Sequence, residues 1–185
     1  MADSRGRMTA DPWAELDERL TQLNSLTMPP NVARAKARDT LTDVRSGSGG
    51  HIEPVDYRGP VTFLRAVGTN NRVFGGEWWF EEALLQRVDH AYSRILFGEE
   101  KARAIRRLLR DGLALSVTWN KMAELWALEV PAGESLRGYR SRAAPQSLFS
   151  GLPVSAANRL LTGGATQIFF PVKNPFWIRA FGSLA

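Results

Sequence analysis

Apolar residues recur at helical spacing near the start of the chain and predict one amphipathic helix. Asp11 stands in front of this stripe as an N-cap, Pro12 suits the first helical position, and Pro29-Pro30 ends the helix. A second helix is predicted over 32–44, with a thinner apolar face. Ser46–Gly50 has the composition of a flexible linker. We therefore expect an N-terminal helical arm with its linker over 1–50 and a separate domain over 51–185. The stripe consists of Trp13, Leu16, Leu20 and Leu23.

Helical and extended patterns alternate over the next sixty residues. Val61–Val67 is β-branched and apolar, which predicts a strand closed by a turn at 68–71. A helix is expected to start near Glu77, and another to run from Gly98 to a C′ residue at Gly112. The stretch 113–119 is ambiguous between helix and strand. The expected inward positions are Leu84, Leu85, Val88, Tyr92, Ile95 and Leu96 in the first helix, and Ile105, Leu108 and Leu109 in the second.

Beyond Lys121 the pattern changes to short apolar runs separated by Gly and Pro. These runs predict strands over 125–130, 135–139, 166–170 and 177–181. Helices thus come first and a mostly antiparallel sheet comes last. Such segregation is typical of the α+β class rather than of alternating βαβ units.

Composition excludes several kinds of protein. Of 185 residues, 44% are hydrophobic, which suffices for a folded core. The chain has no cysteine, so a disulfide scaffold, a thiolate zinc site and a cysteine nucleophile are excluded, and with only two histidines we expect no metal site. No apolar run is long enough to predict a membrane span. The first residues contain no apolar segment of the kind found in a cleaved signal peptide. We expect a location in the cytoplasm of the producing cell, or secretion by a route that needs no signal peptide.

The formal charge of +5 is concentrated in the last third of the chain. Residues 131–185 carry six basic residues and one acidic residue, Glu134. A surface built from this third is expected to attract an anionic partner, although plain solubility also explains the charge. The basic run Lys101–Arg110 has helical spacing and is interpreted as the solvated face of a helix. Nucleic-acid modules usually carry denser basic clusters interleaved with aromatic residues, so nucleic acid is not the partner we expect.

The residues 161–171, LTGGATQIFFP, carry the strongest local signal for chemistry. Gly163 and Gly164 allow a tight turn or a close approach to a ligand. Gln167 then stands near the start of an apolar strand and shares a face with Phe169, while Thr166 and Ile168 share the other. Such a glutamine, at the mouth of a sheet, could orient a substrate. The alternative is a hairpin turn followed by an edge-strand glutamine.

A longer pattern joins this turn to the preceding strands. The run LEVPAGESLRGYRSRAAPQ at 128–146, followed by GGATQIFF at 163–170, resembles the C-terminal half of NAD-consuming toxin domains of the ADP-ribosyltransferase-like fold. The necrotizing-toxin family of NAD glycohydrolases is the most similar in kind. Upstream, NRVFG at 71–75 is similar to the family's dinucleotide-binding segment. The family also uses a histidine just ahead of the middle strand, where this chain has Ala123-Glu124-Leu125-Trp126.

The resemblance implies an ADP-ribosyltransferase-like β core and a bacterial toxin or effector that hydrolyses the nicotinamide–ribose bond of NAD(P)+. It makes Gln167 the catalytic residue and Arg72 a dinucleotide-binding residue. NAD(P)+ is then the substrate, neither metal nor cofactor is required, and an immunity or inhibitor protein is an expected partner. Transferases of this fold usually carry a glutamate near the strand at 166–170, which has none.

Hydrolysis of this bond mainly requires that the dinucleotide be held and a water placed. Arg137 or Arg140, with Arg72, could clamp the pyrophosphate through guanidinium forks. Trp78 or Trp79 could stack on a ring, and Gly163 and Gly164 could approach the ligand. Two alternatives stay open: ADP-ribosyl transfer with the acid supplied by Glu77 or Glu124, and a non-enzymatic module whose basic last third binds nucleic acid or an acidic protein.

Overall fold

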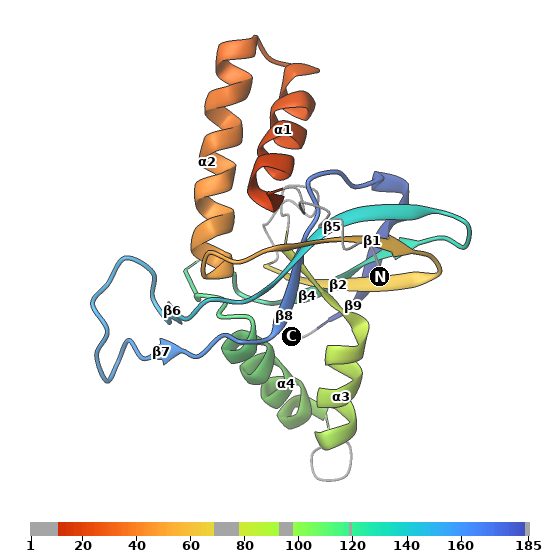
Figure 1. The fold of residues 1–185 in the computed structure, drawn as a ribbon. Helices are drawn as coiled ribbons and strands as arrows, with labels where there is room; N and C mark the ends of the chain where they lie inside the picture. Colours follow the sequence, from red (N-terminus) through yellow and green to blue (C-terminus); the bar gives the residue numbers. More distant parts are fainter. Residues whose placement is uncertain (1–10, 69–77, 93–97, 119, 184–185) are drawn as a thin grey trace, which may run out of the picture. The chain divides into compact units, whose positions relative to one another are not determined.

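The computed structural model describes residues 11–68, 78–92, 98–118 and 120–183, and these form two units that meet between Val44 and Arg45. The first unit holds α1 (Pro12–Ser25) and most of α2 (Pro30–Ser48), which lie side by side (Figure 1). The Asp11 carboxylate accepts a hydrogen bond from the Trp13 backbone N–H at 3.0 Å, which confirms the predicted N-cap. Buried positions recur every three or four residues along both helices: Leu16, Leu20, Ala33, Ala37, Leu41 and Val44.

The second unit is built on a seven-stranded sheet in which every neighbouring pair is antiparallel. The strand order is β1-β5-β8-β3-β2-β4-β9, and β6 and β7 form a separate two-stranded sheet (Figure 1). The α+β class is therefore confirmed. The elements are β1 (Glu53–Arg58), β2 (Val61–Val67), β3 (Trp78–Glu81), α3 (Glu82–Tyr92), α4 (Gly98–Gly112), β4 (Glu124–Val130), β5 (Ser135–Arg142), β6 (Gln146–Ser147), β7 (Leu160–Leu161), β8 (Thr166–Phe169), the 3₁₀ turn η2 (Pro175–Trp177) and β9 (Ile178–Ser183).

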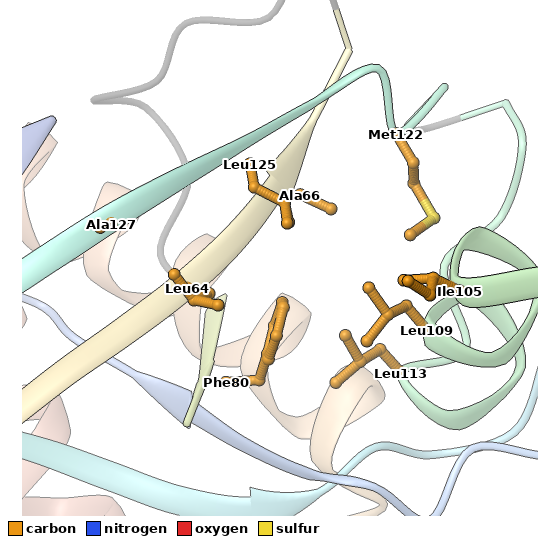
Figure 2. Packing of buried hydrophobic residues seen from close by; sticks show 9 residues of the cluster. All are labelled: Leu64, Ala66, Phe80, Ile105, Leu109, Leu113, Met122, Leu125 and Ala127. Atoms are coloured by element: carbon orange, nitrogen blue, oxygen red, sulfur yellow. The ribbon is translucent and has the colours of Figure 1, made fainter. Parts of the chain in front are cut away.

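Helix α4 packs its apolar side on one face of the sheet. Ile105, Leu109 and Leu113 lie against apolar side chains of β2, β3 and β4 (Figure 2). Leu108, which was also expected to point inward, is 39% exposed because it lies on the outer side of α4. The strand residues of this cluster are Leu64, Ala66, Phe80, Leu125 and Ala127.

The opposite face of the sheet carries a second buried cluster, rich in aromatic rings. The rings of Tyr57 and Phe63 lie 4.8 Å apart between centroids, and Phe170 contacts both edge-to-face. Tyr57 belongs to β1 and Phe63 to β2, which are the first and fifth strands in the sheet order. The sheet must therefore curve strongly enough for these strands to meet across its face.

The structure corrects two predictions about local elements. Residues 78–81 form β3 rather than the start of a helix, because Trp78 and Trp79 pair with β8 and Phe80 pairs with β2. Aromatic residues favour strands, and the helix α3 begins only at Glu82. The stretch 113–119 belongs to neither a helix nor a strand at its described positions.

Ser46–Gly50 is not a flexible linker. Ser46 to Ser48 complete α2, and Gly49 and Gly50 turn the chain with φ values of +62° and +82°. The Gly47 carbonyl accepts a hydrogen bond from the backbone N–H of Ala144 at 2.8 Å, and Ser48 is buried. Composition predicted flexibility here, but the backbone hydrogen bond from Ala144, just after β5, attaches this segment to the rest of the second unit.

Candidate functional site

A cavity of about 180 Å³ lies in the second unit where β2, β3, β8 and the loop after α4 come together. Three residues considered for the site from the sequence, Gln167, Trp78 and Trp79, line this cavity. The remaining wall residues are Arg65, Ala66, Phe80, Leu113, Leu115 and Asn120.

Gln167 is the polar residue of β8 that faces the cavity side of the sheet. Its side-chain Nε2 donates to the Gly47 carbonyl at 2.8 Å and to the Ser141 hydroxyl at 3.4 Å. A carbonyl can only accept, so the amide nitrogen must point toward Gly47, and the amide oxygen points away from it. No described residue donates a hydrogen bond to that oxygen. The fold thus holds Gln167 in one orientation and leaves an acceptor available beside the cavity.

The same contacts show that Gln167 is packed inside the second unit rather than exposed at the edge of the sheet. Only 6% of this residue is exposed, although it lies just three positions after Gly164. The predicted alternation along β8 holds, since Ile168 and Phe170 belong to the opposite buried cluster.

The Gly-Gly turn shapes the backbone before β8 rather than lining the cavity. Gly163 and Gly164 have φ values of +67° and +85°. A Cβ on Gly163 would lie 2.3 Å from the Ala143 carbonyl oxygen, so only glycine fits there. The N–H of Gly163 donates to the Asp111 carbonyl at 2.9 Å, and that of Gly164 to the Ala143 carbonyl at 2.8 Å. These bonds attach the turn to α4 and β5, and so fix where Gln167 enters the sheet.

Trp78 forms the aromatic wall of the site. Its ring stands edge-on to Phe169 with centroids 5.6 Å apart. The indole also lies so close to Gly47 that a Cβ on that glycine would be 3.3 Å from Cζ2. Gly47, from the segment expected to be a linker, therefore contacts both Trp78 and Gln167 and helps to position them. Trp79 also borders the cavity, but it belongs to the buried cluster on the opposite face of the sheet, so Trp78 is the member of the pair better suited to stacking.

The loop after α4 closes another side of the cavity through hydrogen bonds. The Asn120 amide donates to the Ala66 carbonyl at 2.6 Å and accepts from the Met122 N–H at 2.8 Å. Arg110 donates through both ends of its guanidinium fork, to the Leu115 carbonyl at 2.7 Å and to the Asn120 carbonyl at 3.0 Å. Burial lowers the pKa of Arg110. The sequence analysis did not single out Arg110 or Asn120. Their sequence neighbours do not show which backbone groups these two side chains bind in the folded protein.

The other predicted site residues lie elsewhere. Arg72 is outside the described residues. Arg137 forms an ion pair with Asp56 at 2.9 Å, and Arg140 forms one with Glu53 at 2.7 Å, both between β1 and β5. Neither arginine lines the cavity, whose described walls include one cation, Arg65. In the part of the chain that the structure describes, no cluster of three His, Asp or Glu residues could hold a metal ion.

Ion pairs also neutralise much of the basic last third. Beyond the two pairs just described, Arg159 pairs with Asp111 at 2.7 Å and Arg179 pairs with Glu129. Each acidic partner comes from the first 130 residues. Four of the six basic residues of the last third are therefore paired with acidic residues from earlier in the chain.

No protein-family model matches the chain, and no curated protein matches it either. Among helices of the described residues, none combines the length and apolar character needed to cross a bilayer.

Proposed function

We propose that the protein is a glycohydrolase that cleaves the nicotinamide–ribose bond of NAD(P)+. The observation that carries this proposal is that Gln167 and Trp78 line one small cavity, with the Gln167 amide oxygen available. The resemblance of 128–146 and 163–170 to NAD-consuming toxin domains supports the same activity. As part of this proposal, the protein acts as a bacterial toxin or effector, and an inhibitor protein protects its producer.

The size of the cavity suits one ring of the substrate. A dry cavity of about 150 Å³ in another protein holds benzene, so about 180 Å³ can hold the nicotinamide ring but not a dinucleotide. We place the ring against Trp78 and the rest of the dinucleotide outside. Arg65 at the wall, and Arg72 by the resemblance, would hold the phosphates through charge-assisted hydrogen bonds.

The reaction needs little covalent chemistry from the protein. The bond between the pyridinium nitrogen and ribose C1′ breaks, and its electron pair returns to the nitrogen, which leaves as neutral nicotinamide. Water forms the new bond to C1′ and gives its proton to solvent. Positive charge develops on the ribose in between, and a fixed, neutral amide oxygen stabilises it or orients the water. In this proposal, Gln167 supplies that amide oxygen.

ADP-ribosyl transfer receives less support from the site. Glu124, one candidate for the missing acid, accepts a hydrogen bond from Trp126 Nε1 at 3.0 Å and does not line the cavity. Glu77, the other candidate, lies outside the described residues.

The test is release of free nicotinamide from NAD and, separately, from NADP by the full chain. Trp78→Phe is expected to raise KM, because it removes part of the wall that contacts the ring. Trp126→Phe is the matched control, since Trp126 is also half-buried in the second unit but lines no part of the cavity. The proposed activity would be refuted if no nicotinamide were released from NAD in excess and none from NADP in excess. Equal effects of the two substitutions would refute the assigned ring site.

A further inference from the structure

An open groove of about 1010 Å³ runs along the outer side of α4, away from the proposed substrate cavity. Most of the side chains that line it are cationic. They come from α4, from the loop before β4 and from the residue directly before β7. They are Arg103, Arg106, Arg107, Arg110, Lys121 and Arg159.

Two of these cations already have partners. Arg110 binds the carbonyls of its own loop, and Arg159 pairs with Asp111 at 2.7 Å. The other four cationic side chains make no hydrogen bond or ion pair with any described residue. The carboxylate of Glu100 also lines the groove, without pairing with any of the four. These four, which we call the groove cations, are Arg103, Arg106, Arg107 and Lys121.

The fold forces these like charges together. Arg103, Arg106 and Arg107 are spaced by three and four residues, which places them on one side of a helix within about one turn. The helix cannot rotate to separate them from the groove, because Ile105 and Leu109 on its other side are buried in the core. Like-charged neighbours at this spacing destabilise a helix. An anionic ligand would offset that repulsion.

The lining of the groove indicates which anion fits. Its described walls contain no aromatic side chain, so there is no platform for stacking unpaired bases. A single leucine, Leu108, is notably exposed there, which falls short of the apolar centre of a protein interface. A row of guanidinium groups matches phosphate oxygens in both charge and geometry. Backbone phosphates of a duplex supply such charges at regular intervals.

We propose that the groove cations bind the phosphodiester backbone of double-stranded nucleic acid, independently of its base sequence. This surface differs from the basic last third to which the charge pattern pointed. It also assigns a role to a helix face that the sequence pattern treated as merely solvated. The site is separate from the cavity, so this inference does not depend on the NAD(P)+ activity.

The test measures binding of the full chain to a labelled random-sequence DNA duplex by fluorescence anisotropy between 50 and 200 mM salt. With four phosphate contacts, affinity should fall about 100-fold or slightly more over this range, because each contact contributes about 0.9 to the logarithmic salt slope. The triple substitution Arg103→Gln, Arg106→Gln, Arg107→Gln should reduce that fall to about fourfold. Glutamine keeps good helix propensity, so circular dichroism should remain unchanged.

A charge-matched variant separates the groove from net charge. Arg34→Gln, Lys36→Gln, Arg38→Gln removes the same three charges from exposed positions of α2, and it should retain the wild-type salt slope. Equal losses in both triple variants, or no binding by the wild type at 50 mM salt, would overturn the proposal. Tighter binding to single-stranded DNA, or to polyglutamate at equal charge concentration, would also overturn it and favour a stacking site or an acidic protein partner.

Discussion

Replacing Gln167 by glutamate turns the side-chain amide nitrogen into an oxygen. In the wild type that nitrogen, Nε2, donates a hydrogen bond to the backbone carbonyl of Gly47 at 2.8 Å, and the residue is 6% exposed. An ionised carboxylate at this position would face the carbonyl oxygen without a proton between them, inside the protein. A protonated carboxyl group can still donate there, so the variant is expected to keep its buried side chain neutral.

The sign of the resulting pH dependence follows from this difference. Below about pH 4 the new carboxyl group is protonated in both the folded and the unfolded state, and the variant should approach wild-type stability. Above that pH the unfolded chain loses the proton while the folded protein retains it. The free energy of unfolding then falls by about 1.4 kcal/mol for each pH unit over which this holds. A loss of about 2–3 kcal/mol corresponds to roughly 4–12 °C for a chain of this size.

Thermal unfolding from pH 4 to pH 8 provides the assay. The gap in Tm between the wild type and Gln167→Glu should widen as pH rises. Gln146→Glu is the control, because Gln146 is half-buried in β6, does not line the proposed substrate cavity and has no side-chain hydrogen bond among the described residues. A gap for Gln167→Glu that stays constant or narrows toward pH 8 would refute the hydrogen-bond assignment.

The alanine variant separates catalysis from folding. Gln167→Ala removes two hydrogen bonds and should lower the unfolding free energy by about 1–3 kcal/mol. The Gly47 carbonyl keeps its bond from the Ala144 N–H, which limits the loss. If Gln167 acts on the transition state, kcat should fall by about 10²–10³-fold at a temperature well below the variant's Tm. Wild-type kcat in the folded variant would leave Gln167 with a structural role alone.

Three further predictions concern stability. The fragment 45–185 should unfold at a clearly higher temperature than the fragment 51–185, because only the longer one keeps Gly47, which binds Ala144 just after β5. Equal Tm values would mean that residues 45–50 act only as a linker. Gly163→Ala should lower Tm several degrees more than Gly164→Ala, since both have positive φ but only the first meets a backbone oxygen at 2.3 Å; equal losses would contradict that contact. Burial raises the pKa of Tyr57 to about 12, and its hydroxyl has no partner among the described residues. Wild-type stability should therefore fall as pH rises from about 10 toward 12, and Tyr57→Phe should lessen that fall and be at least as stable at pH 7; an unchanged alkaline profile would count against the buried hydroxyl.

Much of the fold could be predicted from local patterns. The cap at Asp11, the periodicity of α4 and the apolar runs of β2, β4 and β8 are signals carried by neighbouring residues, and the structure confirms them. The strand β3 was missed, although its aromatic residues favour a strand, because it is only four residues long and pairs with strands far away in the chain. The edge strand β1 was missed as well, since Pro54 and Asp56 disfavour a strand by composition.

For the site, sequence alone determined which residue types could serve: a glutamine behind two glycines, and a tandem tryptophan far from it along the chain. Tertiary structure decided their arrangement, because each deciding contact joins distant positions. Gln167 and Gly47 are 120 residues apart, and that hydrogen bond sets the direction of the amide. Arg140 and Glu53 are 87 residues apart, and pairs of this kind neutralise the basic third. Side-chain chemistry is local, whereas orientation and charge balance depend on which segments the fold brings together.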